Sequence, residues 1–238
     1  MFTYSVLPTW IEIIKIFFRN NSKQFDENIK KINNNNQYRL LSSSSWSIMI
    51  ICILRIKLKK QKKINLYIPE YFCFNALKFI DRKIVNIIYF KIDQNLNPLL
   101  NDKDFNVNIE KNKPDIMLYV NYFGEKNNLN FNYIKFHDLW LIEDCTHCIE
   151  TYKNIGNTGN FVIMSLYKNF ALPNGAILSL NKNNQKNLNY VSSYFENNDK
   201  WNDLLKQIYK QKPFHNLFAL FNDFLWVLKK VIQKIFSF

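Results

Sequence analysis

Short apolar runs rich in β-forming residues recur along the middle of this chain, separated by segments long enough for a helix or a loop. The runs occupy residues 64–68, 85–90, 116–121, 139–142, 161–165 and 176–180. Strands that alternate with such connections are typical of a parallel sheet with helices on both faces. The sequence therefore predicts an α/β fold with a mostly parallel sheet sandwiched by helices.

Helical patterns flank this region. Periodicity is present at residues 10–18 and again from Trp46 to about Leu58, where the serines at 42–45 can cap the start of a helix. The core of the second helix is an apolar run that is too short to span a membrane, which predicts a buried helix. No further strand is evident after Leu180.

Apolar side chains recur at helical spacing from Phe214 to Phe236, with the lysines mostly on the other side. This helix either packs against the core or a second subunit, or it lies on an anionic membrane as a peripheral contact. We expect three regions: an N-terminal helical segment over 1–37, a large domain over 38–182 and a helical C-terminal segment over 183–238.

The net charge is +13, which raises the question of a nucleic-acid partner. The basic residues are spread over the whole chain, and no nucleic-acid-binding motif accompanies them. A solvated basic face is the preferred interpretation, and no nucleic acid is expected. The one dense run comprises Lys57, Lys59, Lys60, Lys62 and Lys63.

The four cysteines, at 52, 73, 145 and 148, do not form two ligand pairs with metal-site spacing. Cys145, His147 and Cys148 lie close together and suggest zinc as an alternative, but a second pair of ligands is lacking, so no metal is expected. The chain opens without a signal-sequence pattern. A reducing, cytoplasmic location is the simplest expectation.

All four glycines fall between Tyr122 and Leu180, at 124, 156, 159 and 175, which indicates that backbone geometry matters in this segment. Asp144 ends the apolar run at 139–142, and ligands of open α/β sheets gather at the carboxyl ends of strands. A carboxylate there can hold a protonated ring nitrogen. An ordinary helix-capping aspartate is the alternative.

Lys168 follows three residues after the run at 161–165 and precedes a turn that contains Gly175. A lysine held at a strand end and partly desolvated can lose its proton and form an imine with an aldehyde. One more solvent-facing lysine in a lysine-rich chain is the alternative.

The order of these elements resembles the DegT/StrS family of sugar aminotransferases, which depend on pyridoxal 5'-phosphate (PLP). The resemblance covers residues 38–180, the large domain only. The matching segments are LSSSSWSIMIICIL at 41–54, IPEYFCFNAL at 68–77, YFKIDQNLNPLL at 89–100, VNYFG at 120–124, LIEDCTH at 141–147, YKNIGNTGN at 152–160 and SLYKNFALPNGA at 165–176.

The resemblance implies roles for individual residues. Lys168 would hold PLP and move the proton between substrate and cofactor, and Asp144 would pair with the pyridine nitrogen. His147 would lie near the ring oxygen, and Tyr71 would stack on the ring. For His147 and Tyr71, ordinary core residues are the alternative.

The phosphate of the cofactor also needs a binding site, which the resemblance places at the start of the helix after residue 41. Backbone N–H groups at Ser45 and Trp46 would bind it there, and Ser165 would add a hydroxyl contact. An ordinary N-cap is the alternative for Ser45.

The function implied is transfer of an amino group from an amino acid donor, expected to be glutamate, to a nucleotide-linked keto sugar in polysaccharide or glycan synthesis. A homodimer is implied as well. Family members usually continue into a small α/β domain, and this one is expected to be reduced or missing. The alternatives are a relative that binds PLP or a partner without catalysis, and a basic peripheral membrane protein.

Overall fold

The computed structural model describes residues 22–33, 36–100, 102–127, 138–148, 155–170, 172, 174–181 and 188–210, together with positions 225 and 228. The helix expected at residues 10–18 lies outside these residues. So does the amphipathic segment from Phe214 to Phe236, apart from those two positions. Both stay predictions.

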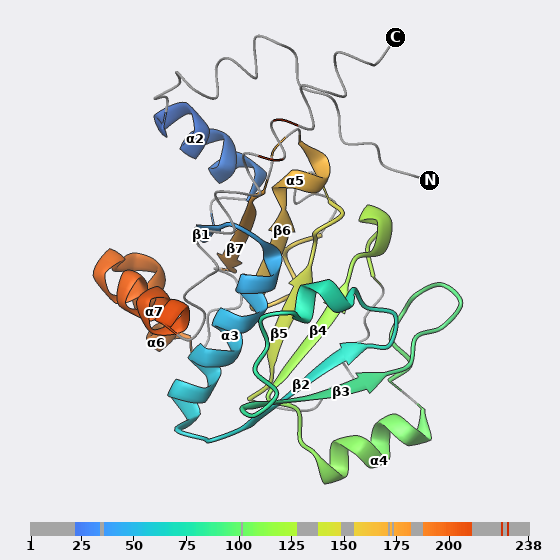
Figure 1. The fold of residues 1–238 in the computed structure, drawn as a ribbon. Coiled ribbons are helices and arrows are strands. Elements are labelled where there is room, and N and C mark those ends of the chain that lie inside the picture. Colours follow the sequence, from blue (N-terminus) through green and yellow to red (C-terminus); the bar gives the residue numbers. More distant parts are fainter. Residues whose placement is uncertain are drawn as a thin grey trace.

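One seven-stranded sheet forms the centre of the molecule (Figure 1). Its order is β1-β7-β6-β5-β4-β2-β3. Strands β2 to β6 run parallel to one another, whereas β7 is antiparallel to both β6 and β1. The strands are β1 (Gln37–Leu41), β2 (Ile64–Pro69), β3 (Val85–Phe90), β4 (Ile116–Val120), β5 (Trp140–Asp144), β6 (Phe161–Ser165) and β7 (Ala176–Leu180).

Helices cover both faces of this sheet (Figure 1). One face packs against α3 (Ser44–Lys59), α6 (Asn189–Glu196) and α7 (Asn198–Lys210). The opposite face packs against α2 (Ser22–Ile32) at one end and α4 (Lys103–Lys111) at the other. The α/β sandwich predicted from the sequence is therefore confirmed.

Each of the six predicted apolar runs forms a strand, because side chains on both faces of the sheet are buried. In β6, Phe161 and Ile163 face α3, whereas Val162 and Met164 face the α2 side. Both sets are fully or almost fully buried. A continuous apolar run rather than an alternating one is the expected pattern for a strand covered on both faces.

Strand β1 is not evident in the sequence because its residues are mostly polar or half-buried. It lies at the edge of the sheet and is fixed by tertiary contacts of Arg39 with the C-terminal helices. The guanidinium donates to the Tyr194 carbonyl at 3.0 Å and lies 5.2 Å above the Trp201 ring. Helix α6 lies inside the segment expected to be helical, 183–238, and its buried apolar residues are Val191 and Phe195.

The predicted helix from Trp46 is α3, and it continues past the apolar run because the charged Arg55 is itself buried. Its guanidinium forms an ion pair with Asp138 at 3.1 Å and approaches Asp115 at 4.0 Å. It also stacks 4.8 Å over Trp140. One cation thus attaches α3 to the amino ends of β4 and β5. No helix among the described residues is both long and apolar enough to cross a membrane.

Glu143, buried near the end of β5, organises the loop that carries two of the glycines. Its carboxylate accepts backbone N–H bonds from Gly156 at 2.7 Å, Thr158 at 2.9 Å and Gly159 at 3.0 Å, and a side-chain bond from Asn121 at 2.9 Å. A Cβ on Gly159 would lie only 2.8 Å from the Glu143 Cβ. The expectation that backbone geometry matters at this glycine is thus met.

We predict that Arg55→Ala lowers the free energy of unfolding by about 3 kcal/mol, because it removes a packed side chain, leaves Asp115 without its cation and leaves Asp138 with Lys59 alone. Lys57→Ala, two residues further along α3 and with an exposed bond to Gln207, should change it by less than about 0.5 kcal/mol. Chemical denaturation measures both. Equal effects of the two substitutions would contradict the anchoring role of Arg55.

Glu143→Gln should lower the free energy of unfolding by about 2 to 4 kcal/mol, because the amide turns a donor toward backbone N–H groups and loses the charge that they bind. Amide hydrogen exchange at residues 156–159 should speed up in the same variant. The exposed Glu110→Gln is the matched control. Unchanged exchange in the Glu143 variant would show that another contact holds the loop.

Candidate functional site

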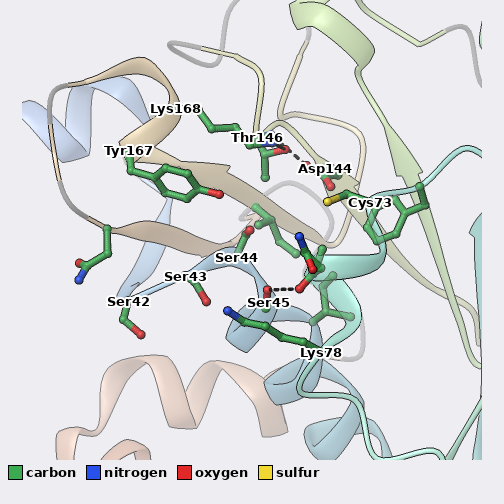
Figure 2. A pocket seen from close by; sticks show the side chains of 16 residues that line it. Ser42, Ser43, Ser44, Ser45, Cys73, Lys78, Asp144, Thr146, Tyr167 and Lys168 are labelled. Carbon is green, nitrogen blue, oxygen red and sulfur yellow. Dashed lines mark hydrogen bonds between the residues drawn. The ribbon is translucent and has the colours of Figure 1, made fainter. Parts of the chain in front are cut away.

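A cavity of about 480 Å³ opens at the carboxyl ends of β5 and β6, next to the first turn of α3 (Figure 2). Lys168, Thr146 and Asp144 line one side of it, and the four serines at 42–45 line the other. Residues that follow β2 close a third side. A pocket at this edge of an open α/β sheet is the expected position for a ligand.

Lys168, Thr146 and Asp144 form a connected row (Figure 2). The Lys168 Nζ donates to the Thr146 Oγ1 at 3.2 Å, and the Thr146 backbone N–H donates to the Asp144 Oδ1 at 2.9 Å. Lys168 lies on the short helix α5 (Leu166–Asn169), directly after β6, and Asp144 ends β5. The amine and the carboxylate thus come from neighbouring parallel strands.

Asp144 is 6% exposed, and this burial dominates its electrostatics. Burial raises the pKa of the carboxyl group, while the Thr146 hydrogen bonds and the charges of Lys168 and His147 oppose the shift. The carboxylate is therefore ionised at a cost, and a cationic partner in the cavity would relieve that cost.

His147 lies beside this row but is not among the residues that line the cavity. Its Nδ1 accepts the Phe123 backbone N–H at 3.3 Å, and the two rings stack with centroids 6.0 Å apart. Partial burial of the ring and the charge of Lys168 lower the pKa of His147, and Asp144 opposes this. Phe123 adopts a left-handed backbone conformation with φ of 56°, uncommon for a bulky residue.

The serine side of the cavity is the amino end of α3. Ser43 is the N-cap residue, in extended conformation and without a side-chain capping bond. Ser45 is therefore inside the helix, not its N-cap, and its hydroxyl donates to the Asn75 carbonyl at 3.2 Å. The first N–H groups of a helix have no acceptor within it, so this end offers donors and a positive dipole.

Three buried serine hydroxyls in this region have no hydrogen-bond partner among the described residues: those of Ser43, Ser47 and Ser165. Ser43 lines the cavity. Ser165 is fully buried and lies on the same face of β6 as Ile163, which also lines the cavity. Unpaired buried hydroxyls are costly, and a ligand with acceptor oxygens would satisfy them.

The side chains of Trp46 and Tyr71 are not part of the cavity lining. The Trp46 indole stacks on Phe79 in the core, with centroids 3.9 Å apart, and its backbone N–H donates to the Ser43 carbonyl. Tyr71 is 61% exposed and absent from the cavity lining, where Phe72 and Cys73 lie instead. The turn after β2 directs Tyr71 outward, and the Tyr122 hydroxyl donates to its carbonyl.

Thr146 and Lys78 are cavity residues that the sequence did not reveal. Thr146 lies inside the motif at 141–147, and its hydroxyl next to a strand-end carboxylate was the available signal. Lys78 had no signal, because it is one of many lysines and only the fold brings it to the cavity.

Cys145 and Cys148 are buried in the interior, whereas His147 is turned to the surface. The Cys145 thiol accepts a hydrogen bond from the Asn121 amide at 3.3 Å. The described residues contain no cluster of three or more side chains able to bind a metal ion.

No protein-family profile and no curated protein matches the sequence. The fold, in contrast, is similar to solved structures. An aminotransferase of the DegT/DnrJ/EryC1/StrS group from Brucella abortus shows 13% identity and a TM-score of 0.54, over 71% of this chain and 50% of that one. GDP-4-keto-6-deoxy-D-mannose-3-dehydratase from E. coli, with bound hydrated PLP, shows 17% identity and a TM-score of 0.56, over 75% of this chain and 51% of that one.

A mutant GDP-4-keto-6-deoxymannose-3-dehydratase with bound GDP-perosamine shows 20% identity and a TM-score of 0.56, over 67% of this chain and 44% of that one. The chain thus spans about half the length of these proteins. At such low identity the likeness establishes the fold alone: a mostly parallel seven-stranded sheet flanked by helices, which this chain shares with part of each of these structures.

Proposed function

We propose that this protein binds PLP on Lys168 and transfers an amino group from an amino acid, with glutamate as the expected donor, to a nucleotide-linked keto sugar. The observation that carries the proposal is the row of Lys168, Thr146 and Asp144 along a cavity whose opposite side is a helix amino end. Amine, buried carboxylate and anion site are the three features that PLP requires.

The residues present fit this cofactor. Lys168 would bind the aldehyde carbon of the cofactor. Asp144 would bind its ring nitrogen through a charge-assisted hydrogen bond, which would stabilise the desolvated carboxylate. The amino end of α3 and the hydroxyls of Ser43 and Ser165 would hold its phosphate. When bound, PLP supplies a ring that accepts electrons from the substrate carbon.

In this mechanism the protein groups hold and move protons. With PLP bound, the Lys168 amine would be the base that accepts the proton of the amino donor's substrate carbon, and its conjugate acid would be the proton donor to the keto sugar. Thr146 positions that amine by accepting its hydrogen bond. Asp144 would keep the ring nitrogen protonated, and the His147 imidazole would donate from Nε2, because its Nδ1 accepts the Phe123 N–H.

The keto-sugar substrate is proposed from the relatives of similar fold, two of which are named for GDP-linked keto sugars. The surplus of positive charge on the chain favours an anionic substrate of this class. A homodimer and a role in surface polysaccharide synthesis are further parts of the proposal. Incubation with PLP, glutamate and a panel of nucleotide-linked keto sugars, with mass analysis of the products, tests the substrate class.

Borohydride reduction of the protein with PLP should place a stable phosphopyridoxyl label on Lys168, as read by peptide mapping. Lys168→Arg should lose the label, because its guanidinium cannot form the imine. Lys206→Arg, at a largely exposed lysine on α7, should keep it. A label on another lysine, or one that persists in Lys168→Arg, would refute the assignment.

Asp144→Asn should raise the melting temperature of the ligand-free protein at neutral pH and reduce amino transfer about 100-fold or more. The pKa of Asp144 is higher in the folded than in the unfolded chain, so its ionisation costs stability as pH rises above the ordinary range of about 3.9. The thermal gain should vanish at acid pH, where the carboxyl group is protonated in both states. Asp203→Asn, at an exposed residue, is the control. Unchanged transfer would exclude the proposed role.

A further inference from the structure

Exposed basic side chains gather where the parallel strands begin, at the edge of the sheet opposite the cavity. They come from the connections that lead into β2, β3 and β4. In Figure 1 these connections meet at the lower end of α3, on the side of the sheet away from α5. We call this surface the basic edge, and its exposed residues are Lys60, Lys62, Lys63, Arg82, Lys83 and Lys113.

The sheet itself brings these side chains together. Strand β2 lies between β3 and β4, and all three are parallel. The Ile64 N–H donates to the Ile84 carbonyl at 3.1 Å, and the Asn65 side-chain amide donates to the Lys113 carbonyl at 3.0 Å. Neighbouring strands are about 4.8 Å apart, so the three connections lie within about 10 Å, close to the Debye length at physiological salt. The charges of the basic edge therefore act together.

The acidic residues of the same region are engaged elsewhere. Asp115 and Asp138 face the buried Arg55, and Asp81 accepts the Lys83 backbone N–H at 2.9 Å. Within the part of the chain that the structure describes, no side chain of the basic edge forms an ion pair with an acid. Like charges crowded in this way repel one another, and an anionic surface would relieve the repulsion.

The chemistry of the basic edge favours lipid headgroups over nucleic acid as this anionic surface. Five of its six side chains are lysines, which are flexible point charges without the planar fork that arginine uses to bind one phosphate in a fixed geometry. The described residues 60–63, 81–84 and 111–115 include no exposed large apolar side chain on which a base could stack. Clusters of four to eight basic residues are typical of binding to anionic lipids.

We propose that the basic edge docks this protein onto an anionic lipid surface. Because the cavity lies at the opposite ends of the same strands, it faces away from the lipid in the docked protein and stays open to solvent. The inference goes beyond the proposed function and does not depend on PLP. It also uses a different surface from the segment at 214–236, for which the sequence left a membrane contact open.

The experiment is co-sedimentation of the full-length protein, without PLP, with vesicles of equal parts phosphatidylcholine and phosphatidylglycerol, and with vesicles of phosphatidylcholine alone. The wild type should bind only the anionic vesicles, and added salt should release it. A variant with Lys62, Lys63, Lys83 and Lys113 all replaced by Gln should bind about 100-fold more weakly or less, since each lysine near such a surface contributes about fivefold.

A second variant removes the same charge elsewhere and is the matched control. It replaces four exposed lysines that are scattered over α2, the loop after β4 and α7, namely Lys30, Lys126, Lys200 and Lys206. This variant should keep most of the binding, because its lysines are not clustered. The melting temperature of the basic-edge variant should equal or exceed that of the wild type, since its lysines are exposed and repel one another.

Two double variants, one at Lys62 and Lys63 and one at Lys83 and Lys113, should each lose about 10-fold, and they keep the test valid should the fourfold variant fail to fold. Equal losses in the two fourfold variants, or binding of the wild type to neutral vesicles, would overturn the proposal. Binding retained by the basic-edge variant would assign the lipid contact to another surface. Wild-type protein that binds duplex DNA and not anionic vesicles would replace lipid with nucleic acid as the partner.

Discussion

Strand β5 ends in two adjacent buried carboxylates, and most of the structure around the cavity depends on how each is satisfied. Neighbouring residues of a strand point to opposite faces of the sheet, so Glu143 and Asp144 enter different environments. Glu143 accepts three backbone N–H bonds and closes the loop at 156–159. Asp144 accepts one backbone N–H bond, from Thr146, and lines the edge of the cavity. The first carboxylate builds the fold, and the second is left available to a ligand.

Because Glu143 is fully hydrogen-bonded and Asp144 is not, the residues around the cavity lower the stability of the fold instead of raising it. A buried carboxylate with few hydrogen bonds prefers to be protonated, and the fold pays for holding it near neutral pH. The unpaired Ser43 and Ser165 hydroxyls are costs of the same kind. Asp144 and Ser43 line the same cavity, where one ligand with a cationic group and acceptor oxygens would satisfy both.

The sequence predicted what depends on burial and missed what depends on tertiary placement. Apolar runs such as 161–165 became strands because both sheet faces are covered, and Lys168 and Asp144 were placed by strand-end logic. Strand β1 was missed because contacts of Arg39 with distant helices hold it. The outward position of Tyr71 could not be predicted, because the direction of a turn after a strand leaves no periodic signal. Lys78 is likewise brought to the cavity only by the packing of the short helix η1 (Phe74–Leu77) against α3.

The two ends of the cavity come from segments more than a hundred residues apart, and one glycine couples them. The Gly175 N–H donates to the Ser42 carbonyl at 3.0 Å, and its own carbonyl accepts the Leu166 N–H, also at 3.0 Å. It holds φ of 129°, a conformation that side chains rarely adopt. Leu166 begins α5, which carries Lys168. The two hydrogen bonds of Gly175 therefore fix the position of Lys168 relative to the serines. Gly175 thus sets the distance between the Lys168 amine and the serines at the start of α3. A ligand that contacts both sides of the cavity must match this distance.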